Sequence, residues 1–392
     1  MRKLAAHYIF SIVAEPVRNG IITLSDEGEI LHISQGSGNL QEEEGVEFYS
    51  GVLVPGFVNA HCHLELSHLK NQIAKGTGLP QFFRKIVGLR DKFSPGQILQ
   101  AAALADAQMH AGGTSVVADI SNTGTTFLLK KNSKIRYHTF IEKLCWREED
   151  LSATVQSAKD LVHEAHAIGI PATPAPHAPY SCLPELLQAL SSMAGAGGLM
   201  SVHHQEAPGE KEMFAGRGGA LQDLYVAAGM TSVPDGSRTS TQYLTGYLPR
   251  DLRILLIHNT LCTEPDYEVA AAYWKNLSWV LCPSSNRYIE NRLPPVEMLR
   301  KKKANIAIGT DSLSSNTGLQ VVDELKVLQQ NFPYISLQEC LTWATLNGAK
   351  ALGVDAQFGS FEVGKQPGVV LLEKLNLQQL SLTPTTTSTR LL

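Results

Sequence analysis

The sequence predicts a mixed α/β protein: a (β/α)8 barrel joined to a small composite β-sandwich domain formed by both chain ends. From about Gly51, short apolar segments alternate with longer stretches of helical character. The residues before that point contain only strand-like segments, and another strand-like segment follows the last expected helix. Such alternation is typical of a parallel sheet covered by helices. We therefore expect the barrel at 51–353 and the composite β domain at 1–50 and 354–392.

The expected strands near the chain ends are identified by their composition. Residues 8–13, 20–24 and 30–34 are rich in the β-branched and aromatic side chains that favour strands. Residues 369–373 have the same character near the other end. The threonine-rich segment 383–389 is of low complexity, and we expect it to be frayed.

Eight strand-like segments make up the expected barrel. They lie at 52–60, 114–119, 136–144, 170–176, 199–204, 253–258, 279–283 and 305–310. The clearest helical stretches between and after them lie at 97–110, 150–167, 184–194, 265–274 and 337–352. A doubly wound sheet is the structural alternative, but it fits less well because no glycine-rich phosphate loop follows any of these strands.

The composition excludes several classes of protein. A hydrophobic content of 43% with 18% charged residues excludes a disordered chain. The net charge of −4 argues against a general nucleic-acid surface. No apolar run reaches the roughly 18 residues of a membrane span, and no signal-peptide core follows the basic start. Six scattered cysteines without C-x-x-C spacing predict neither a disulfide framework nor a zinc ribbon. We expect a soluble cytoplasmic protein.

The first expected barrel strand ends in a His-x-His pair, His61 and His63. Because side chains alternate along a strand, both imidazoles project to one face, where two neutral rings can bind a divalent metal ion. By itself the pair could equally be two strand histidines packed there by chance. Further apolar strands end at His203, His258 and Asp311, where a barrel enzyme collects its catalytic groups. Histidine with aspartate suits zinc or a similar first-row ion.

These residues resemble the amidohydrolase superfamily. The resemblance rests on 55–63, the pair His203 and Glu206, His258, and 309–316. Within the superfamily they are similar to the branch that holds cytosine and guanine deaminases, adenosyl-nucleoside deaminases and triazine chlorohydrolases. The resemblance covers nearly the whole chain.

The resemblance implies one divalent metal ion, most simply zinc, with iron, nickel or manganese as alternatives. Its implied ligands are His61, His63, His203 and Asp311. It also implies catalytic roles for Glu206 as proton shuttle and for His258 and Asp311 beside the attacking water. Glu206 is three positions after His203, so we expect the strand to end between them. Two-metal members carry a lysine at the end of the fourth strand; 170–177 contains none, which favours one metal.

The resemblance also indicates where the substrate binds. His177 lies in 176–181, a segment similar to one that contacts substrate in nucleoside and nucleobase deaminases. Further substrate-binding candidates are Glu65, Asn122, Trp146 and Ser312. Trp146 is as readily a core residue as a stacking platform.

The function implied is hydrolysis of a non-peptide C–N bond. We expect removal of an exocyclic amine from a heteroaromatic base or nucleoside, adenosine-like as in aminofutalosine or adenosyl-homocysteine, or guanine or cytosine. The alternatives are hydrolysis of another C–N or C–Cl bond on the same fold, and a non-catalytic barrel used as a scaffold. The expected partners are a small-molecule substrate and a second copy of the chain in a homodimer, with no nucleic acid and no membrane.

Overall fold

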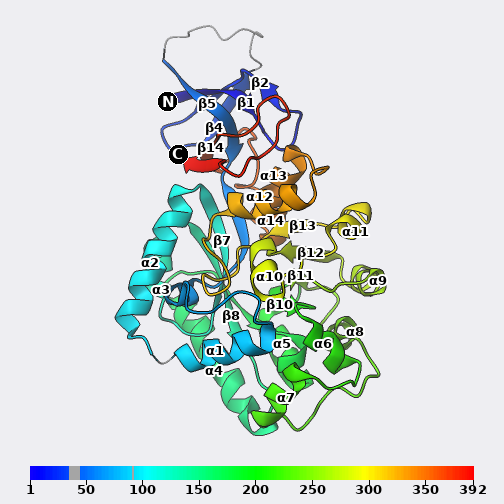
Figure 1. Ribbon diagram of the computed structural model, residues 1–392. Coiled ribbons are helices and arrows are strands. Elements are labelled where there is room, and N and C mark those ends of the chain that lie inside the picture. The colour runs from blue at the N-terminus through cyan, green and yellow to red at the C-terminus, as the bar shows by residue number, and fades with distance from the viewer. Residues whose placement is uncertain (35–44, 91) are drawn as a thin grey trace.

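The computed structural model describes residues 1–34, 45–90 and 92–392. Within these ranges the chain is a mixed α/β protein with one seven-stranded sheet and two four-stranded parallel sheets. Both termini lie at the same end of the molecule, beside the seven-stranded sheet, and helices surround the other two sheets (Figure 1). No helix in the described ranges is long and apolar enough to cross a membrane.

The seven-stranded sheet joins the two ends of the chain. Its strand order is β15-β14-β5-β1-β3-β4, with β2 paired to β1. The strands are β1 (Arg2–Ile9), β2 (Val17–Arg18), β3 (Ile21–Leu24), β4 (Ile30–Ser34), β5 (Val46–Pro55), β14 (Val369–Glu373) and β15 (Thr387–Arg390). β5 pairs in parallel with β1 and antiparallel with β14, so the N-terminal and C-terminal segments share one set of backbone hydrogen bonds.

Two local expectations are corrected at this sheet. The threonine-rich end is not frayed: β15 pairs with β14, and the hydroxyl of Ser388 donates to the carbonyl of Gly112 at 2.7 Å. The single strand expected at 52–60 is two strands, β5 and β6 (Phe57–Cys62), divided at Gly56. A Cβ at Gly56 would lie 1.9 Å from Ser115 Oγ, so only glycine fits where the chain passes between the sheets.

The two parallel sheets follow the chain in order. One contains β6, β7 (Thr114–Ser121), β8 (Arg136–Lys143) and β9 (Ala172–Pro176); the other contains β10 (Leu199–His204), β11 (Arg253–His258), β12 (Asn276–Leu281) and β13 (Ile306–Ile308). Backbone hydrogen bonds link the sheets at both edges. At one edge, between β9 and β10, the N–H of His203 donates to the carbonyl of His177 at 2.8 Å. At the other, between β13 and β6, the N–H of Thr310 donates to the carbonyl of His61 at 3.0 Å.

Helices connect most of these strands. They are α1 (Leu79–Arg90), α2 (Pro95–Ala111), α3 (Phe127–Asn132), α4 (Leu151–Ala167), α5 (Pro184–Ala194), α6 (Pro208–Phe214), α7 (Ala220–Ala227), α8 (Ser240–Tyr247), α9 (Glu264–Tyr273), α10 (Pro283–Glu290), α11 (Val296–Lys301), α12 (Val321–Asn331), α13 (Leu337–Ala344) and α14 (Leu346–Leu352). The single helix expected at 337–352 is α13 and α14, because Thr345 leaves helical geometry at φ −132° and ψ −87°. Short 3-10 helices occur at η1 (Leu64–Leu69), η2 (Glu148–Asp150) and η3 (Pro179–Ser181).

Alternate strand residues pack on opposite sides of the parallel sheets. Val58 of the first sheet shares a buried cluster with Leu255 and Val280 of the second. The neighbouring residues Leu256 and Trp279 belong instead to the cluster that includes the surrounding helices. The two sheets therefore enclose a common apolar interior, and the carboxyl ends of their strands meet around one site.

Candidate metal and active site

The His-x-His pair lies where β6 ends. His61 is the penultimate residue of β6, and His63 follows the strand directly and immediately precedes η1. Both side chains are buried, and their Nε2 atoms lie 3.2 Å apart. The alternation of side chains along the strand thus brings both rings to one point, as the spacing predicts.

His203 reaches the same point from the end of β10. Its Nε2 lies 3.3 Å from Nε2 of His63. Its Nδ1 lies 2.9 Å from the carbonyl oxygen of His177, an acceptor to which only a protonated ring nitrogen can donate. The proton is therefore on Nδ1, and the lone pair of Nε2 faces the other two imidazoles, which is the arrangement that metal-ligating histidines adopt.

Asp311 completes the cluster from the segment after β13. Its Oδ1 lies 3.4 Å from Nε2 of His63 and 3.7 Å from Nε2 of His61. The hydroxyls of Ser285 and Ser315 donate to the other oxygen, Oδ2, at 2.5 and 2.7 Å. Because Oδ2 is already engaged by these hydroxyls, Oδ1 is the oxygen turned toward the imidazoles.

The protonation states of this cluster suit a cation. Burial lowers the pKa of His61 to about 3 and also lowers the pKa of His203, so both rings are neutral at neutral pH. Burial acts to raise the pKa of Asp311, but the hydrogen bond with His61 and the nearby rings of His63 and His258 hold that pKa well below its usual value. Neutral imidazole nitrogens and a carboxylate oxygen converging in one buried place fit a divalent metal ion.

His258 ends β11 beside the cluster. Its Nε2 lies 3.6 Å from Oε1 of Glu206, and its Nδ1 lies 3.3 Å from Nδ2 of Asn286. Burial holds the pKa of His258 well below its ordinary value, so the ring is neutral. His61, His258 and Asp311 also offer ligand atoms within 4.8 Å of one another. The ring is therefore placed next to the candidate metal position.

Glu206 enters the site because the chain turns after β10. That strand ends at His204, and Gln205 adopts a positive φ of 48°, as the three-residue separation from His203 requires. Burial and the nearby Asp311 raise the pKa of Glu206 well above its usual value, which favours the protonated carboxyl. His204 faces away, with its ring nitrogens 2.9 Å from Oδ1 of Asn259 and from the hydroxyl of Thr241.

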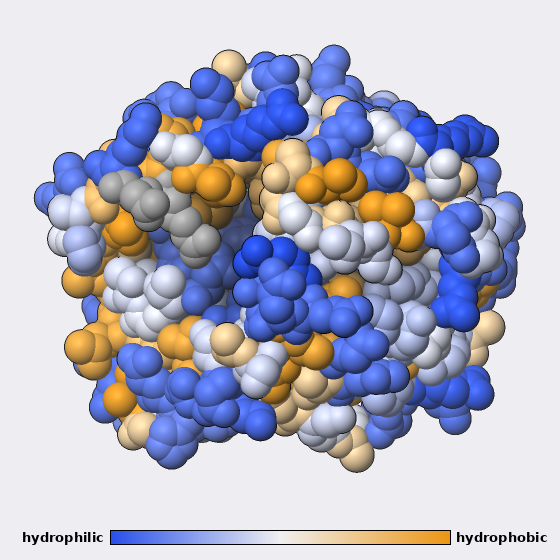
Figure 2. Space-filling model, turned by 90° about the horizontal axis from the view of Figure 1, so that it is seen from below, coloured by the Kyte–Doolittle hydropathy of each residue, from blue (hydrophilic) through white to orange (hydrophobic). Residues whose placement is uncertain are grey.

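A cavity of about 620 Å³ opens onto this cluster. Its polar end is formed by His63, His203, Glu206, His258 and Asp311 together with His177, Asn122, Glu142, Trp146 and Ser312. Its apolar wall includes Leu79, Phe82, Phe83, Ile86 and Val87 of α1. Leu224 and Tyr225 of α7 belong to the same wall, as does Ala228, which follows α7. On the face seen in Figure 2, hydrophobic side chains border a hollow in an otherwise mainly hydrophilic surface.

Four of the five candidate substrate residues line the cavity, and Glu65 does not. The Glu65 carboxylate accepts hydrogen bonds from the backbone N–H groups of Asn122 and Thr123 and from the Thr123 hydroxyl, at 2.8 to 3.2 Å. It therefore holds the loop that carries Asn122. The sequence alone could not distinguish a carboxylate that faces the cavity from one that supports the loop behind it.

Glu142 has a more central place than its sequence context indicates. It ends the buried part of β8, accepts a hydrogen bond from Nδ2 of Asn122 at 3.0 Å, and has Oε1 3.4 Å from Nδ1 of His203. Burial would raise its pKa, but the rings of His177 and His203 outweigh burial and lower the pKa to about 2. Glu142 is therefore ionised within the polar end of the cavity.

The apolar wall on α1 is absent from the sequence-based expectations. Leu79, Phe82, Phe83 and Ile86 recur at helical spacing, a pattern from which an amphipathic helix could have been predicted. Phe83 packs edge-to-face against His177, with ring centroids 5.4 Å apart. The position of α1 over the strand ends is what makes this wall part of the site.

Comparison with known proteins agrees with this geometry. Residues 52–390 match the amidohydrolase family. A 5-methylthioadenosine/S-adenosylhomocysteine deaminase of Moorella thermoacetica is 27% identical over 383 residues, covering 93% of this chain and 84% of the relative. An adenosine deaminase of Helicobacter pylori is 28% identical over 334 residues, covering 81% of this chain and 78% of the relative.

Solved structures share the fold. Helicobacter pylori aminofutalosine deaminase in complex with methylthio-coformycin aligns with a TM-score of 0.79 at 24% identity, covering 95% of this chain and 92% of that one. An adenosine deaminase from Xanthomonas campestris with bound zinc aligns with a TM-score of 0.73 at 23% identity, covering 96% of this chain and 85% of that one. The match over 52–390 confirms the resemblance stated from the motifs. This chain belongs to the amidohydrolase family.

Proposed function

We propose that this protein is a metal-dependent hydrolase that removes the exocyclic amine of an adenosine-like nucleoside and releases ammonia. The observation that carries the proposal is the meeting of a buried, protonated carboxyl, Glu206, with the His and Asp cluster at the polar end of one cavity. The names of the matched relatives, which include deaminases of methylthioadenosine and adenosine, support the substrate class.

One divalent metal ion is proposed at the cluster, with zinc as the leading identity and iron, nickel or manganese as alternatives. Its ligands would be His61, His63, His203 and Asp311. The zinc bound in the similar Xanthomonas structure supports this identity. When bound, the ion would activate water for attack on the ring carbon that carries the amine.

The chain itself would supply the proton transfers. The protonated Glu206 carboxyl would donate its proton to the ring nitrogen beside the attacked carbon. As a carboxylate it would then take the proton of the newly added hydroxyl group and pass it to the departing amine, which leaves as ammonia. His258, neutral and 3.6 Å from Glu206, would orient the water by a hydrogen bond. These roles require both side chains to face the same end of the cavity, which they do.

The cavity lining suggests how the nucleoside would be held. His177, Asn122 and the ionised Glu142 can donate to or accept from polar groups of the base and sugar. The apolar wall on α1, including Phe82 and Phe83, would contact the base or an apolar substituent on the sugar. Glu65 is kept in the proposal as support for the loop that carries Asn122.

Further proposals concern the fold, the oligomeric state and the location of the protein. The hydrogen bonds at both sheet edges and the shared apolar interior support closure of the two sheets into one (β/α)8 barrel. The domain division at 51–353 against 1–50 and 354–392 remains our proposal, with β5 continuing in the terminal sheet to Pro55. Finally, we propose a homodimer located in the cytoplasm.

The test is ammonia release by purified, metal-analysed protein. The panel would contain adenosine, 5-methylthioadenosine, S-adenosylhomocysteine, guanine, cytosine and a chlorinated triazine. Adenosine-type compounds should release ammonia, and Glu206→Gln should keep the metal while turnover falls by roughly 10²–10⁴. Chloride release without ammonia would favour the C–Cl alternative. A metal-loaded protein inactive on every compound would contradict the proposed reaction.

A further inference from the structure

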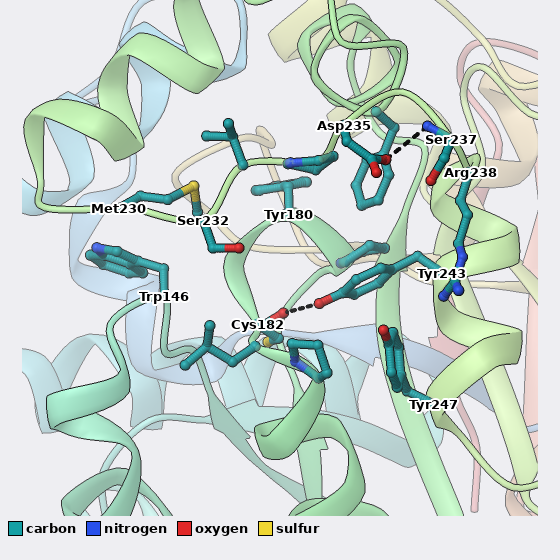
Figure 3. A pocket seen from close by; sticks show the side chains of 16 residues that line it. Trp146, Tyr180, Cys182, Met230, Ser232, Asp235, Ser237, Arg238, Tyr243 and Tyr247 are labelled. Atoms are coloured by element: carbon teal, nitrogen blue, oxygen red, sulfur yellow. Dashed lines mark hydrogen bonds between the residues drawn. The ribbon is translucent and has the colours of Figure 1, made fainter.

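A second cavity of about 320 Å³ (Figure 3) adjoins the reaction cavity at Trp146, which lines both. The segments that form it are the loop after β8, the region around η3, the connection between α7 and α8, and α8 itself. The labelled side chains that line it are Trp146, Tyr180, Cys182, Met230, Ser232, Asp235, Ser237, Arg238, Tyr243 and Tyr247. None of the proposed catalytic steps uses this cavity.

The two cavities share one aromatic wall. Trp146 lines both of them. Its ring packs edge-to-face on Tyr225, with centroids 5.0 Å apart, and Tyr225 packs in turn on Tyr180 at 5.7 Å. The indole Nε1 donates to the carbonyl of Ala228 at 3.0 Å, which ties the wall to the end of α7. A molecule in the second cavity would therefore touch a residue that also faces the reaction cavity.

The lining of the second cavity combines aromatic rings with one exposed cation. Trp146 lies across the cavity from Tyr247 and Arg238 (Figure 3). The Arg238 guanidinium lies over the Tyr247 ring, 5.8 Å from its centroid, and no carboxylate in the described residues lies within ion-pair distance of it. The Tyr243 hydroxyl already donates to the carbonyl of Cys182 at 2.8 Å, so this tyrosine offers its ring.

The charges at the rim restrict the ligand further. Asp235 also lines the cavity, and its Oδ1 accepts the backbone N–H of Ser237 at 2.9 Å. A dianionic phosphate would meet one arginine and a fixed carboxylate, which is an unfavourable balance. A single carboxylate meets less repulsion from Asp235 than a dianion would, and it matches the single guanidinium because two parallel N–H donors fit its two oxygens.

We propose that the second cavity is an accessory binding site for a planar aromatic molecule that carries one carboxylate. The ring lies among Trp146, Tyr243 and Tyr247, and the carboxylate pairs with Arg238. Because Trp146 also lines the reaction cavity, and its Nε1 donates to Ala228 in the wall of that cavity, occupation of this site changes the KM for the nucleoside more than it changes kcat. This kinetic consequence rests on the proposed function, whereas binding itself does not.

Binding is tested by calorimetry on the full-length, metal-loaded protein. The probes are indole-3-acetate and its neutral counterpart indole-3-acetamide, which share one ring and differ in charge. The carboxylate should bind at least about tenfold more tightly than the amide. Arg238→Gln should remove that difference by weakening only the carboxylate, and Tyr247→Ala should weaken both probes.

Arg250→Gln is the matched control. The Arg250 guanidinium also lies over a tyrosine ring, that of Tyr273 at 5.3 Å, but it lines neither cavity. This variant should bind both probes as the wild type does. The proposal is overturned if the wild type does not bind the carboxylate, or if Arg238→Gln and Arg250→Gln bind it equally well.

A separate variant tests whether the probe binds in the reaction cavity instead. Phe83→Ala removes a side chain that lines only that cavity, and should leave probe affinity unchanged. A probe at the accessory site should change KM only until that site is filled. A probe that loses affinity in Phe83→Ala, or that raises the KM in proportion to its concentration without reaching a plateau, would lie in the reaction cavity and overturn the proposal. Absence of ammonia release with intact probe binding would contradict the proposed function alone.

Discussion

The backbone N–H of Leu64 donates to Oδ1 of Asp119 at 2.8 Å, immediately after the candidate metal ligand His63. The Asp119 carboxylate forms an ion pair with Nζ of Lys130 at 2.5 Å, and both side chains are completely shielded from solvent. The turn that presents His63 is therefore anchored on a neighbouring strand by a buried charged group. The stability of that group depends on Lys130.

Lys130→Met should destabilise the protein strongly. Removal of one partner leaves the Asp119 charge buried without compensation, at a cost of about 3–5 kcal/mol in the free energy of unfolding. Urea unfolding measures this loss. Lys131→Met, which removes an exposed lysine from the same helix, should change stability by no more than about 0.5 kcal/mol. The double variant Asp119→Asn with Lys130→Met should lose less free energy of unfolding than Lys130→Met alone, because it leaves no buried charge. An equal loss in the two variants would contradict the charge argument.

His63→Ala should lose the bound metal and the activity together. Its Nε2 lies within 3.4 Å of ligand atoms of His61, His203 and Asp311, so its removal opens the centre of the cluster. Metal content by mass spectrometry, measured beside turnover, checks this. His68→Gln is the control, because His68 packs against Phe93 outside the cluster. Full metal occupancy in His63→Ala would rule out the ligand assignment.

His258→Asn and Asp311→Asn should have different effects although both residues follow apolar strands. His258→Asn should keep the metal and lower turnover, since an amide can donate one hydrogen bond in place of the ring. Asp311→Asn should weaken metal binding, because a neutral amide replaces the carboxylate in a buried cluster. Metal content separates the two variants. Loss of metal in His258→Asn equal to that in His63→Ala would make His258 a ligand.

Phe83→Ala should raise the KM for the nucleoside by about tenfold while kcat changes little. The ring forms part of the apolar wall and packs on His177, so its loss removes contact area that serves binding. Steady-state kinetics on the best substrate of the panel measures both parameters. Phe93→Ala, which changes a ring outside the cavity, should leave KM unchanged. If kcat falls as much as kcat/KM, Phe83 acts in the transition state instead.

Titration of the buried Glu210 carboxyl should make the free energy of unfolding fall as pH rises. Burial raises the pKa of its carboxyl from 4.5 to about 7, so the folded protein retains a proton that the unfolded chain releases. The stabilisation is complete below about pH 4.5 and is lost as pH rises through about 7, by up to roughly 3 kcal/mol. Glu210→Gln cannot titrate, so its unfolding free energy should fall less between pH 5 and pH 8.

Glu212→Gln is the control for that pH dependence. Glu212 is exposed on the same short helix and should leave the pH profile of the wild type unchanged. Denaturant unfolding at pH 5, 6, 7 and 8 provides the comparison. Identical pH profiles for Glu210→Gln and the wild type would show that Glu210 is ionised in the folded protein.

Much of the site could be predicted from local pattern. The alternation of side chains on β6 is enough to place His61 and His63 on one face. The three-residue step from His203 to Glu206 is enough to predict the end of β10, where Gln205 turns the chain. These features depend on a few consecutive residues, whose backbone geometry is set by local sterics and strand propensity.

Other features depended on contacts between distant segments. His63 and His203 are 140 residues apart, yet their Nε2 atoms lie 3.3 Å from each other. The pairing of β15 with β14 overrides the low complexity of the C-terminal segment, because an available strand edge satisfies its backbone groups. By itself the sequence determined which residues end the strands and which chemistry they carry. Only the tertiary structure decided that Glu65 supports a loop, that α1 walls the cavity, and that Trp146 separates two cavities, because these outcomes depend on how distant elements pack.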